Sequence, residues 1–86
     1  MSHIRELVEV LARALADEPQ KVRVSEVQHG GATPVEVFAA PRDIGKMIGR
    51  QGKTIAAMRT LVGVAADREK SRVTLEVRDL TAAPAG

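Results

Sequence analysis

The sequence contains no cysteine, tryptophan or tyrosine, and Phe38 is its only aromatic residue. Without cysteine, neither a disulfide framework nor a thiolate metal site can form. The scarcity of aromatic rings removes base stacking, which contributes about 1–3 kcal/mol per base in many proteins that bind single-stranded nucleic acids. Any binding of that kind has to rest on phosphate contacts and aliphatic packing.

Long apolar runs are also missing. None approaches membrane-spanning length, and the opening residues 1–6 are charged where a signal peptide is apolar. We therefore expect a soluble, cytoplasmic protein that makes no membrane contact. The 86 residues suffice for one small domain, and a hydrophobic content of 44% is ample for its core. We assign residues 1–80 to this domain and residues 81–86 to a disordered tail.

Catalytic and metal-binding patterns do not stand out. There is no Ser-His-Asp, Cys-His or paired-carboxylate arrangement, and the two histidines lack partners at metal-ligand spacing. We expect no enzyme, no cofactor and no small-molecule substrate. The stretch "IGRQGKT" ends as a nucleotide-binding P-loop does, but Met47 occupies the position of that loop's first glycine. The G-x-G-x-x-G motif fails at the same residue, which leaves a short Gly-x-x-Gly.

Helical spacing of apolar residues and their alternation with polar residues predict six elements. They are a helix over residues 2–17, strands over 22–27 and 35–39, helices over 43–48 and 53–66, and a strand over 73–77. A turn at 29–32 should join the first two strands as a hairpin. The last strand is reached through two helices and should therefore be parallel to its neighbour. The predicted fold is α+β, in the order αββααβ, with a three-stranded mixed sheet and three helices on one face.

Single residues carry further expectations. Asp43 should cap the short helix, and Leu61 should lie on the buried stripe of the helix that follows. We expect an irregularity near Glu26, where the alternation loses phase. Gly45 and Gly63 fall inside predicted helices, where close packing is the default interpretation. Phe38 has two interpretations: a core residue, which we favour, or an exposed ring on the far face of the sheet that suits a dimer contact.

Positive charge is concentrated in one segment. Residues 1–40 carry four basic and six acidic side chains, and residues 60–86 carry four of each. Residues 41–59 carry five basic side chains and one acidic side chain, a net charge of +4. Such a cluster is typical of a solvated helix face or of a surface that binds phosphate. Its basic residues are Arg42, Lys46, Arg50, Lys53 and Arg59.

The Gly-x-x-Gly turn lies inside this basic segment, between two predicted helices. The start of a helix offers unpaired N–H groups and the positive end of the dipole, so a phosphate fits there. The glycines lack the Cβ atoms that would hold a sugar-phosphate backbone away. The candidate backbone-binding residues are Gly49, Arg50, Gln51, Gly52 and Lys53. The isoleucines that flank the turn are candidates for an apolar floor beneath bases: Ile44, Ile48 and Ile55.

The stretch "DIGKMIGRQGKTI" resembles the I-G-x-x-G core of a KH domain, and αββααβ is the element order of the prokaryotic, type II KH fold. The resemblance covers roughly residues 3–79. The opening helix, "APRDIGKMIGRQGKTI" and the following "RTLV" are most similar to the stand-alone bacterial KH proteins of the KhpA family. The resemblance implies that the Gly49–Gly52 loop grips about four nucleotides of single-stranded RNA. It places Ile48 and Ile55 at groove positions.

The same resemblance implies an RNA chaperone-like role in post-transcriptional regulation, self-association, and pairing with a larger KH–R3H protein of the KhpB or Jag type. It also implies a connection with cell shape. The alternative is an interaction subunit that acts mainly through homo- or heterodimerisation. The charged turn favours RNA binding, because a scaffold has no need of basic residues beside two glycines. The sequence does not distinguish RNA from single-stranded DNA.

Overall fold

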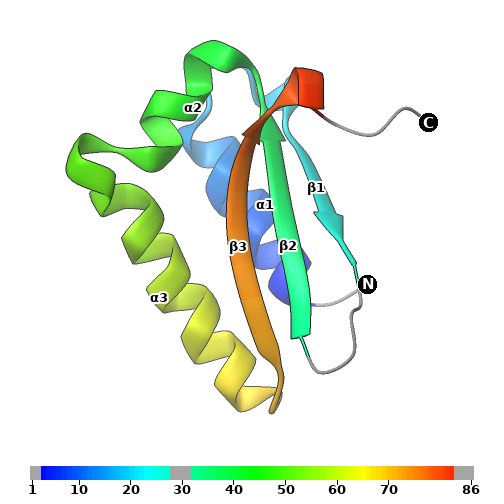
Figure 1. Cartoon of the computed structure of the whole chain (residues 1–86). Coiled ribbons are helices and arrows are strands. Elements are labelled where there is room, and N and C mark those ends of the chain that lie inside the picture. Colours follow the sequence, from blue (N-terminus) through cyan, green and yellow to red (C-terminus); the bar gives the residue numbers. More distant parts are fainter. Residues whose placement is uncertain (1–2, 28–31, 83–86) are drawn as a thin grey trace.

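The first helix, α1 (His3–Leu15), forms because apolar side chains recur at helical spacing along one face. Ile4 and Val8 on that face are buried, while Glu9 on the solvent side pairs with Arg5 and Arg13, one turn away in each direction. The computed structural model describes residues 3–27 and 32–82 (Figure 1). A single 3-10 turn, η1 (Pro19–Lys21), leads from α1 towards the sheet.

Within the described residues the sheet has three strands, in the order β1 (Arg23–Glu26), β2 (Ala32–Ala39) and β3 (Arg72–Asp79). As predicted, β1 is antiparallel to β2 and β3 is parallel to it. Residues 29–31 of the predicted turn lie outside the described residues. The β1–β2 register is regular as far as Glu26, where β1 ends, so the expected irregularity is not inside the strand.

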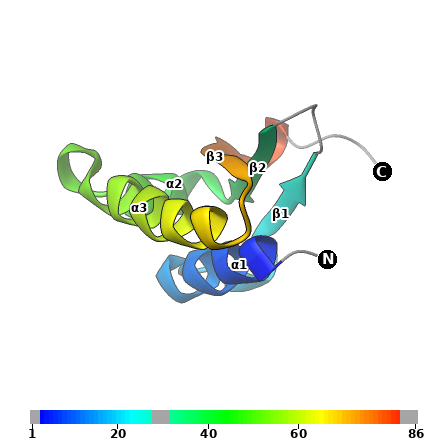
Figure 2. The same ribbon diagram turned by 90° about the horizontal axis from the view of Figure 1, so that it is seen from below.

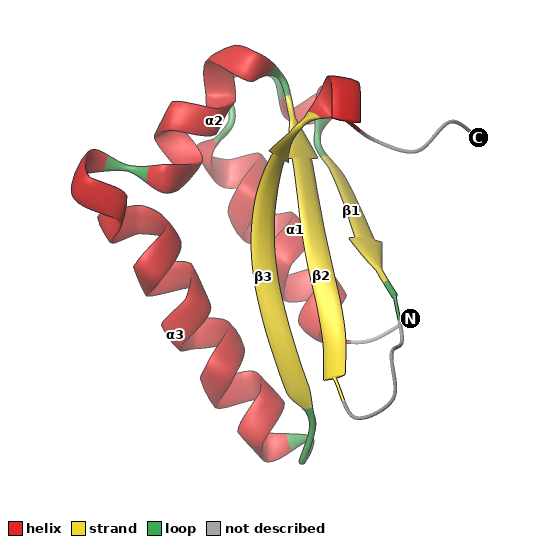
Figure 3. Cartoon of the chain, viewed as in Figure 1, coloured by secondary structure: helices red, strands yellow, loops and turns green. Residues whose placement is uncertain are grey.

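Two further helices connect β2 to β3. They are α2 (Pro41–Ile48) and α3 (Lys53–Arg68), joined by the 3-10 turn η2 (Arg50–Gly52). Figure 2 shows the three helices together on one side of the sheet, and Figure 3 shows the α2–α3 turn projecting away from the strands. The main core lies between the two layers, where β2 and β3 supply Val35, Val37 and Leu75. The α+β fold and its element order are therefore confirmed.

The buried stripe of α3 differs from the predicted one at Leu61 and Ala66. Ile55, Met58 and Val62 are buried as expected, but Leu61 is 50% exposed and Ala66 is buried instead. The stripe therefore continues at i, i+4 from Val62, away from the side on which Leu61 lies. The close-packing interpretation of the helix glycines is also wrong, because nothing lies within 4 Å of a Cβ built at Gly45 or at Gly63.

The sequence predicted that Asp43 caps α2, but it does not. The helix begins at Pro41, whose fixed φ suits the first helical position, and Ala40 occupies the cap without a side-chain hydrogen bond. The helix therefore starts two residues before the predicted one, and Asp43 falls within its first turn. Its side chain is fully buried rather than exposed at the helix end.

Phe38 is 3% exposed, which rules out the exposed-ring interpretation. Its neighbours Val37 and Ala39 belong to the main core, but Phe38 does not, so its ring lies on the other face of β2. The last described element, η3 (Leu80–Ala82), contacts β2. There Asp79 Oδ1 accepts hydrogen bonds from the Thr81 N–H at 2.9 Å and from the Thr81 hydroxyl at 3.0 Å. This 3-10 turn ends the described chain, and residues 83–86 of the predicted tail lie outside it.

Candidate nucleic-acid interface

The Gly-x-x-Gly turn is built as a sharp reversal between α2 and α3. The Gly49 N–H donates to the Gly45 carbonyl at 2.8 Å and ends α2, and the Gly52 N–H donates to the Gly49 carbonyl at 3.1 Å. The Lys53 N–H donates to the Arg50 carbonyl. The turn thus uses part of its own backbone hydrogen-bonding capacity to hold its shape, which leaves a small, fixed projection at one end of the molecule.

The two glycines are required for different reasons. Gly49 has a φ of +77°, and a Cβ built on it would lie 2.2 Å from Thr54 Oγ1 and 2.9 Å from the Thr54 backbone nitrogen. Gly52 has a φ of +73°, but a Cβ there would meet nothing within 4 Å. Gly49 therefore permits the turn to pack on the start of α3, whereas Gly52 supplies backbone conformation and leaves open space above the helix end.

Gln51 also has a left-handed backbone, with φ 57° and ψ 26°. Few non-glycine residues adopt this conformation, which costs roughly 1–2 kcal/mol. Its neighbour Gly52 is left-handed as well. Turns of this kind form backbone concavities that bind anions in other proteins. Strain held at an exposed basic turn is consistent with a functional site.

The N-terminus of α3 is electrostatically unbalanced. Its cap is Gly52, which offers no side-chain hydrogen bond, and its first turn contains no acidic residue. Lys53 lies at the first position instead, where a positive charge opposes the positive end of the helix dipole. A helix start with this combination attracts an anion from outside the chain.

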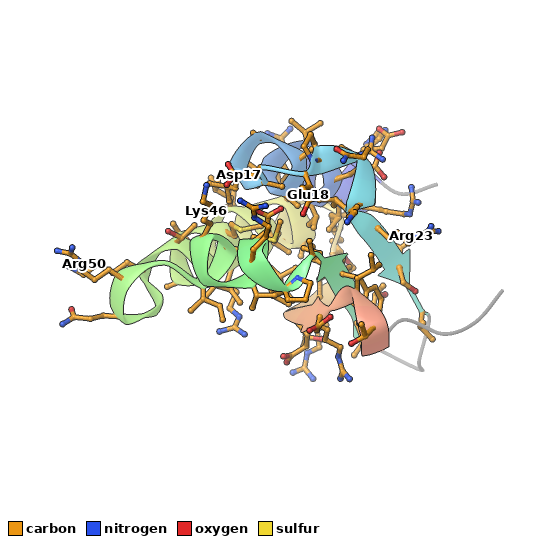
Figure 4. The ribbon with its side chains drawn as sticks, turned by 90° about the horizontal axis from the view of Figure 1, so that it is seen from above. Asp17, Glu18, Arg23, Lys46 and Arg50 are labelled. Carbon is orange, nitrogen blue, oxygen red and sulfur yellow. The ribbon has the colours of Figure 1, made fainter. Side chains whose placement is uncertain are left out.

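The five predicted basic residues are in three different states. Arg50, Lys53 and Arg42 are exposed and have no ion pair within the part of the chain that the structure describes. Figure 4 shows Arg50 at the tip, pointing away from the rest of the molecule. Lys46 Nζ lies 2.5 Å from Asp17 Oδ2. Arg59 donates through Nε and Nη2 to the Leu75 carbonyl, at 3.2 and 3.1 Å. The structure thus brings Arg50 and Lys53 to the turn and holds Arg59 against β3.

The flanking isoleucines divide in the same way. Ile48, next to the turn, is 38% exposed and offers apolar surface. Ile55 is only 9% exposed, and Ile44 packs partly buried against the core. Sequence reasoning missed a cleft of about 290 Å³ between α3 and β3. No local sequence pattern indicates it, because it forms where two elements meet. Its lining residues are Arg59, Val62, Val73, Thr74, Leu75 and Glu76.

Asp43 fixes the base of this interface. Its buried carboxylate accepts the backbone N–H groups of Asp17 at 3.0 Å and Glu18 at 3.1 Å, which ties the end of α1 to the first turn of α2. The pKa of the Asp43 carboxyl lies below its ordinary value, mainly because the Asp17 N–H donates to it. Burial acts in the opposite direction, and the Glu18 N–H and two nearby cations lower the pKa further.

With this geometry established, comparison with known proteins gives the family. A family model described as KhpA/KhpB, KH domain, matches residues 5–77. The chain belongs to the KhpA/KhpB KH-domain family. The observed αββααβ order is that of the type II KH fold.

Curated relatives extend over almost all of the chain. A protein of Halalkalibacterium halodurans is 45% identical over 76 residues, which is 88% of this chain and 100% of the relative. One of Caldanaerobacter subterraneus is 46% identical, covering 84% of this chain and 96% of the relative. One of Aquifex aeolicus is 35% identical, covering 90% and 98%. Each is named RNA-binding protein KhpA. No solved structure matches the chain significantly.

Two other features are missing from residues 3–27 and 32–82. No helix there is both long enough and apolar enough to cross a membrane. No three or more His, Cys, Asp or Glu side chains gather there in a way that could hold a metal ion.

Proposed function

We propose that this protein binds single-stranded RNA and holds the sugar-phosphate backbone at the Gly49–Gly52 turn. The observation that carries the proposal is the uncapped, acid-free start of α3, with Arg50 and Lys53 exposed beside it. Membership of the KH family supports it, as do relatives named RNA-binding protein KhpA. An anionic backbone at the turn would balance the charge that the chain itself leaves unbalanced.

Bases attached to that backbone would extend from the turn along α2 and α3. Ile48 offers them an aliphatic contact, and the α3–β3 cleft lies further along the same helix. Aromatic stacking is not available, so one domain should bind weakly and with modest sequence preference. With about three phosphate contacts, the log–log dependence of the binding constant on salt should have a slope near −2.

Finer parts of the proposal rest on the family alone. We include in it an RNA chaperone-like role in post-transcriptional regulation, action in the cytoplasm without catalysis, and a connection with cell shape. Self-association and pairing with a KhpB/Jag-like protein also belong to the proposal, since two linked sites would raise a weak affinity. A function that consists mainly of dimerisation is not favoured, because the relatives are named for RNA binding.

Amide chemical shifts would test where RNA lies. Titrating ¹⁵N-labelled protein with a short single-stranded RNA should shift the amides of residues 48–55 first, followed by those of the α3–β3 cleft. The open face of the sheet, where Arg23 and Arg78 lie, serves as an internal control and should change little. Shifts concentrated on that face, or no shifts at high micromolar RNA, would contradict the proposed site.

A further inference from the structure

Lys46 is the basic residue nearest the turn on α2, and it is engaged by a carboxylate from a distant part of the chain. Its Nζ lies 2.5 Å from Asp17 Oδ2, and each side chain is about half exposed. Figure 4 shows the two together on the side of α2, with Arg50 at the far tip. Asp17 follows the end of α1, so this contact exists only through tertiary structure.

The backbone of Asp17 is held in place by the buried side chain of Asp43. Its N–H donates to the buried carboxylate of Asp43 at 3.0 Å, and the N–H of Glu18 donates to the other oxygen of the same group. The main chain at Asp17 is therefore held against α2, which keeps its side chain within reach of Lys46. The side chain of Glu18 points elsewhere and pairs with Lys21 at 3.2 Å.

The charge of the interface changes as a result. The segment 41–59 has a net charge of +4 in the sequence, but in the fold Asp17 neutralises one of its five cations. Lys46 lies in the last turn of α2, three residues before Gly49. A phosphate at the turn would have to displace a carboxylate to reach Lys46. The phosphate and the Asp17 carboxylate would compete for the Lys46 ammonium, and the two negative charges would repel each other at close approach.

We propose that Asp17 is a positioning residue that limits RNA affinity by holding Lys46 away from phosphate. This inference rests on the proposed RNA-binding function. In the free protein Lys46 does not count among the available cations. The pairing with Asp17 therefore makes the chain a weaker RNA binder than its basic segment alone would make it. Release of Lys46 from Asp17 would add one phosphate contact to those made by the turn.

The test is the affinity of Asp17→Asn for single-stranded RNA, measured by fluorescence anisotropy over a range of salt concentrations. Asparagine keeps the backbone N–H that Asp43 needs, so the fold should be retained. We expect about two- to fivefold tighter binding, the range that exposed ion pairs provide. The salt slope should become steeper by about 0.7, as one added contact requires.

Glu18→Gln is the matched control. It changes the net charge by the same amount at the adjacent residue but frees Lys21 instead of Lys46. We expect it to have less effect on affinity and none on the salt slope. Adding Lys46→Gln to Asp17→Asn should abolish the gain in RNA affinity. In the wild-type protein, Lys46→Gln should change RNA affinity less than it does in the Asp17→Asn background.

The inference is overturned if Asp17→Asn and Glu18→Gln behave alike, or if the gain survives Lys46→Gln. A failure of the proposed function has a different appearance: neither the wild type nor any variant would bind RNA. A thermal unfolding curve for each variant identifies any loss of affinity that is due to unfolding.

Discussion

Lys53→Glu should separate stability from binding, because Lys53 lies at the first position of α3 with no acidic residue nearby in that turn. A negative charge at a helix N-terminus is favourable, and a positive one is not. We expect the free energy of unfolding to rise by about 0.3–1 kcal/mol in this variant. Urea denaturation followed by circular dichroism measures the change.

The same substitution should weaken RNA binding. On single strands each cation contact contributes a salt slope of about 0.7, which corresponds to roughly fivefold in affinity at about 0.1 M salt. Reversing the charge removes one contact and adds a repulsion, so we expect a loss of roughly 20-fold. Fluorescence anisotropy with a labelled single-stranded RNA measures this loss.

Lys70→Glu is the control, because it makes the same charge change just beyond the other end of α3. The C-terminal end of the helix dipole is negative, so this variant should be less stable than the wild type. Its RNA affinity should change far less than that of Lys53→Glu. The reasoning is refuted if Lys53→Glu binds RNA as the wild type does, or if it is less stable than the wild type.

Four further substitutions test how the interface and the helix that follows it are built. Asp43→Asn should lower stability at neutral pH. The lowered pKa of Asp43 contributes stability above the unfolded value of about 3.9, lost as pH falls through the folded pKa, so melting temperatures of the two proteins should converge in acid. Gly49→Ala should cost about 1–3 kcal/mol in urea denaturation, and Gly52→Ala less, since only Gly49 faces Thr54; equal costs would contradict this. Gly63→Ala should add about 0.5–1 kcal/mol by the same assay, and a loss would show packing at that position.

The order of elements and the location of the basic turn could be predicted because they depend on local patterns. The alternation of Val73, Leu75 and Val77 and the helical spacing of Ile4 and Val8 each specify one element without reference to the rest of the chain. The glycine spacing and the run of basic residues are local in the same sense.

The state of each basic side chain could not be predicted, because it depends on residues far away in sequence. Lys46 is paired with Asp17 across 29 positions, and Arg59 reaches the carbonyl of Leu75 on another element. Counting charge along the segment therefore overstates the cations that the surface offers.

Asp43 shows the same limitation at a buried position. An aspartate near a helix start is typical of a cap, but Pro41 began the helix earlier. The Asp43 carboxylate instead accepts hydrogen bonds from two N–H groups just after α1, and no local pattern indicates these contacts.

The most direct test of the RNA-binding turn is a comparison of the wild type with Arg50→Asp/Gln51→Asp by anisotropy of labelled single-stranded RNA, at about 50 and 200 mM salt. Aspartate tolerates the left-handed backbone at position 51, so the variant should fold, which circular dichroism verifies. We expect the wild type to bind and to weaken roughly 20-fold between the two salt concentrations, and the variant not to bind. A folded variant that binds with wild-type affinity, or wild-type binding that is insensitive to salt, would contradict the account.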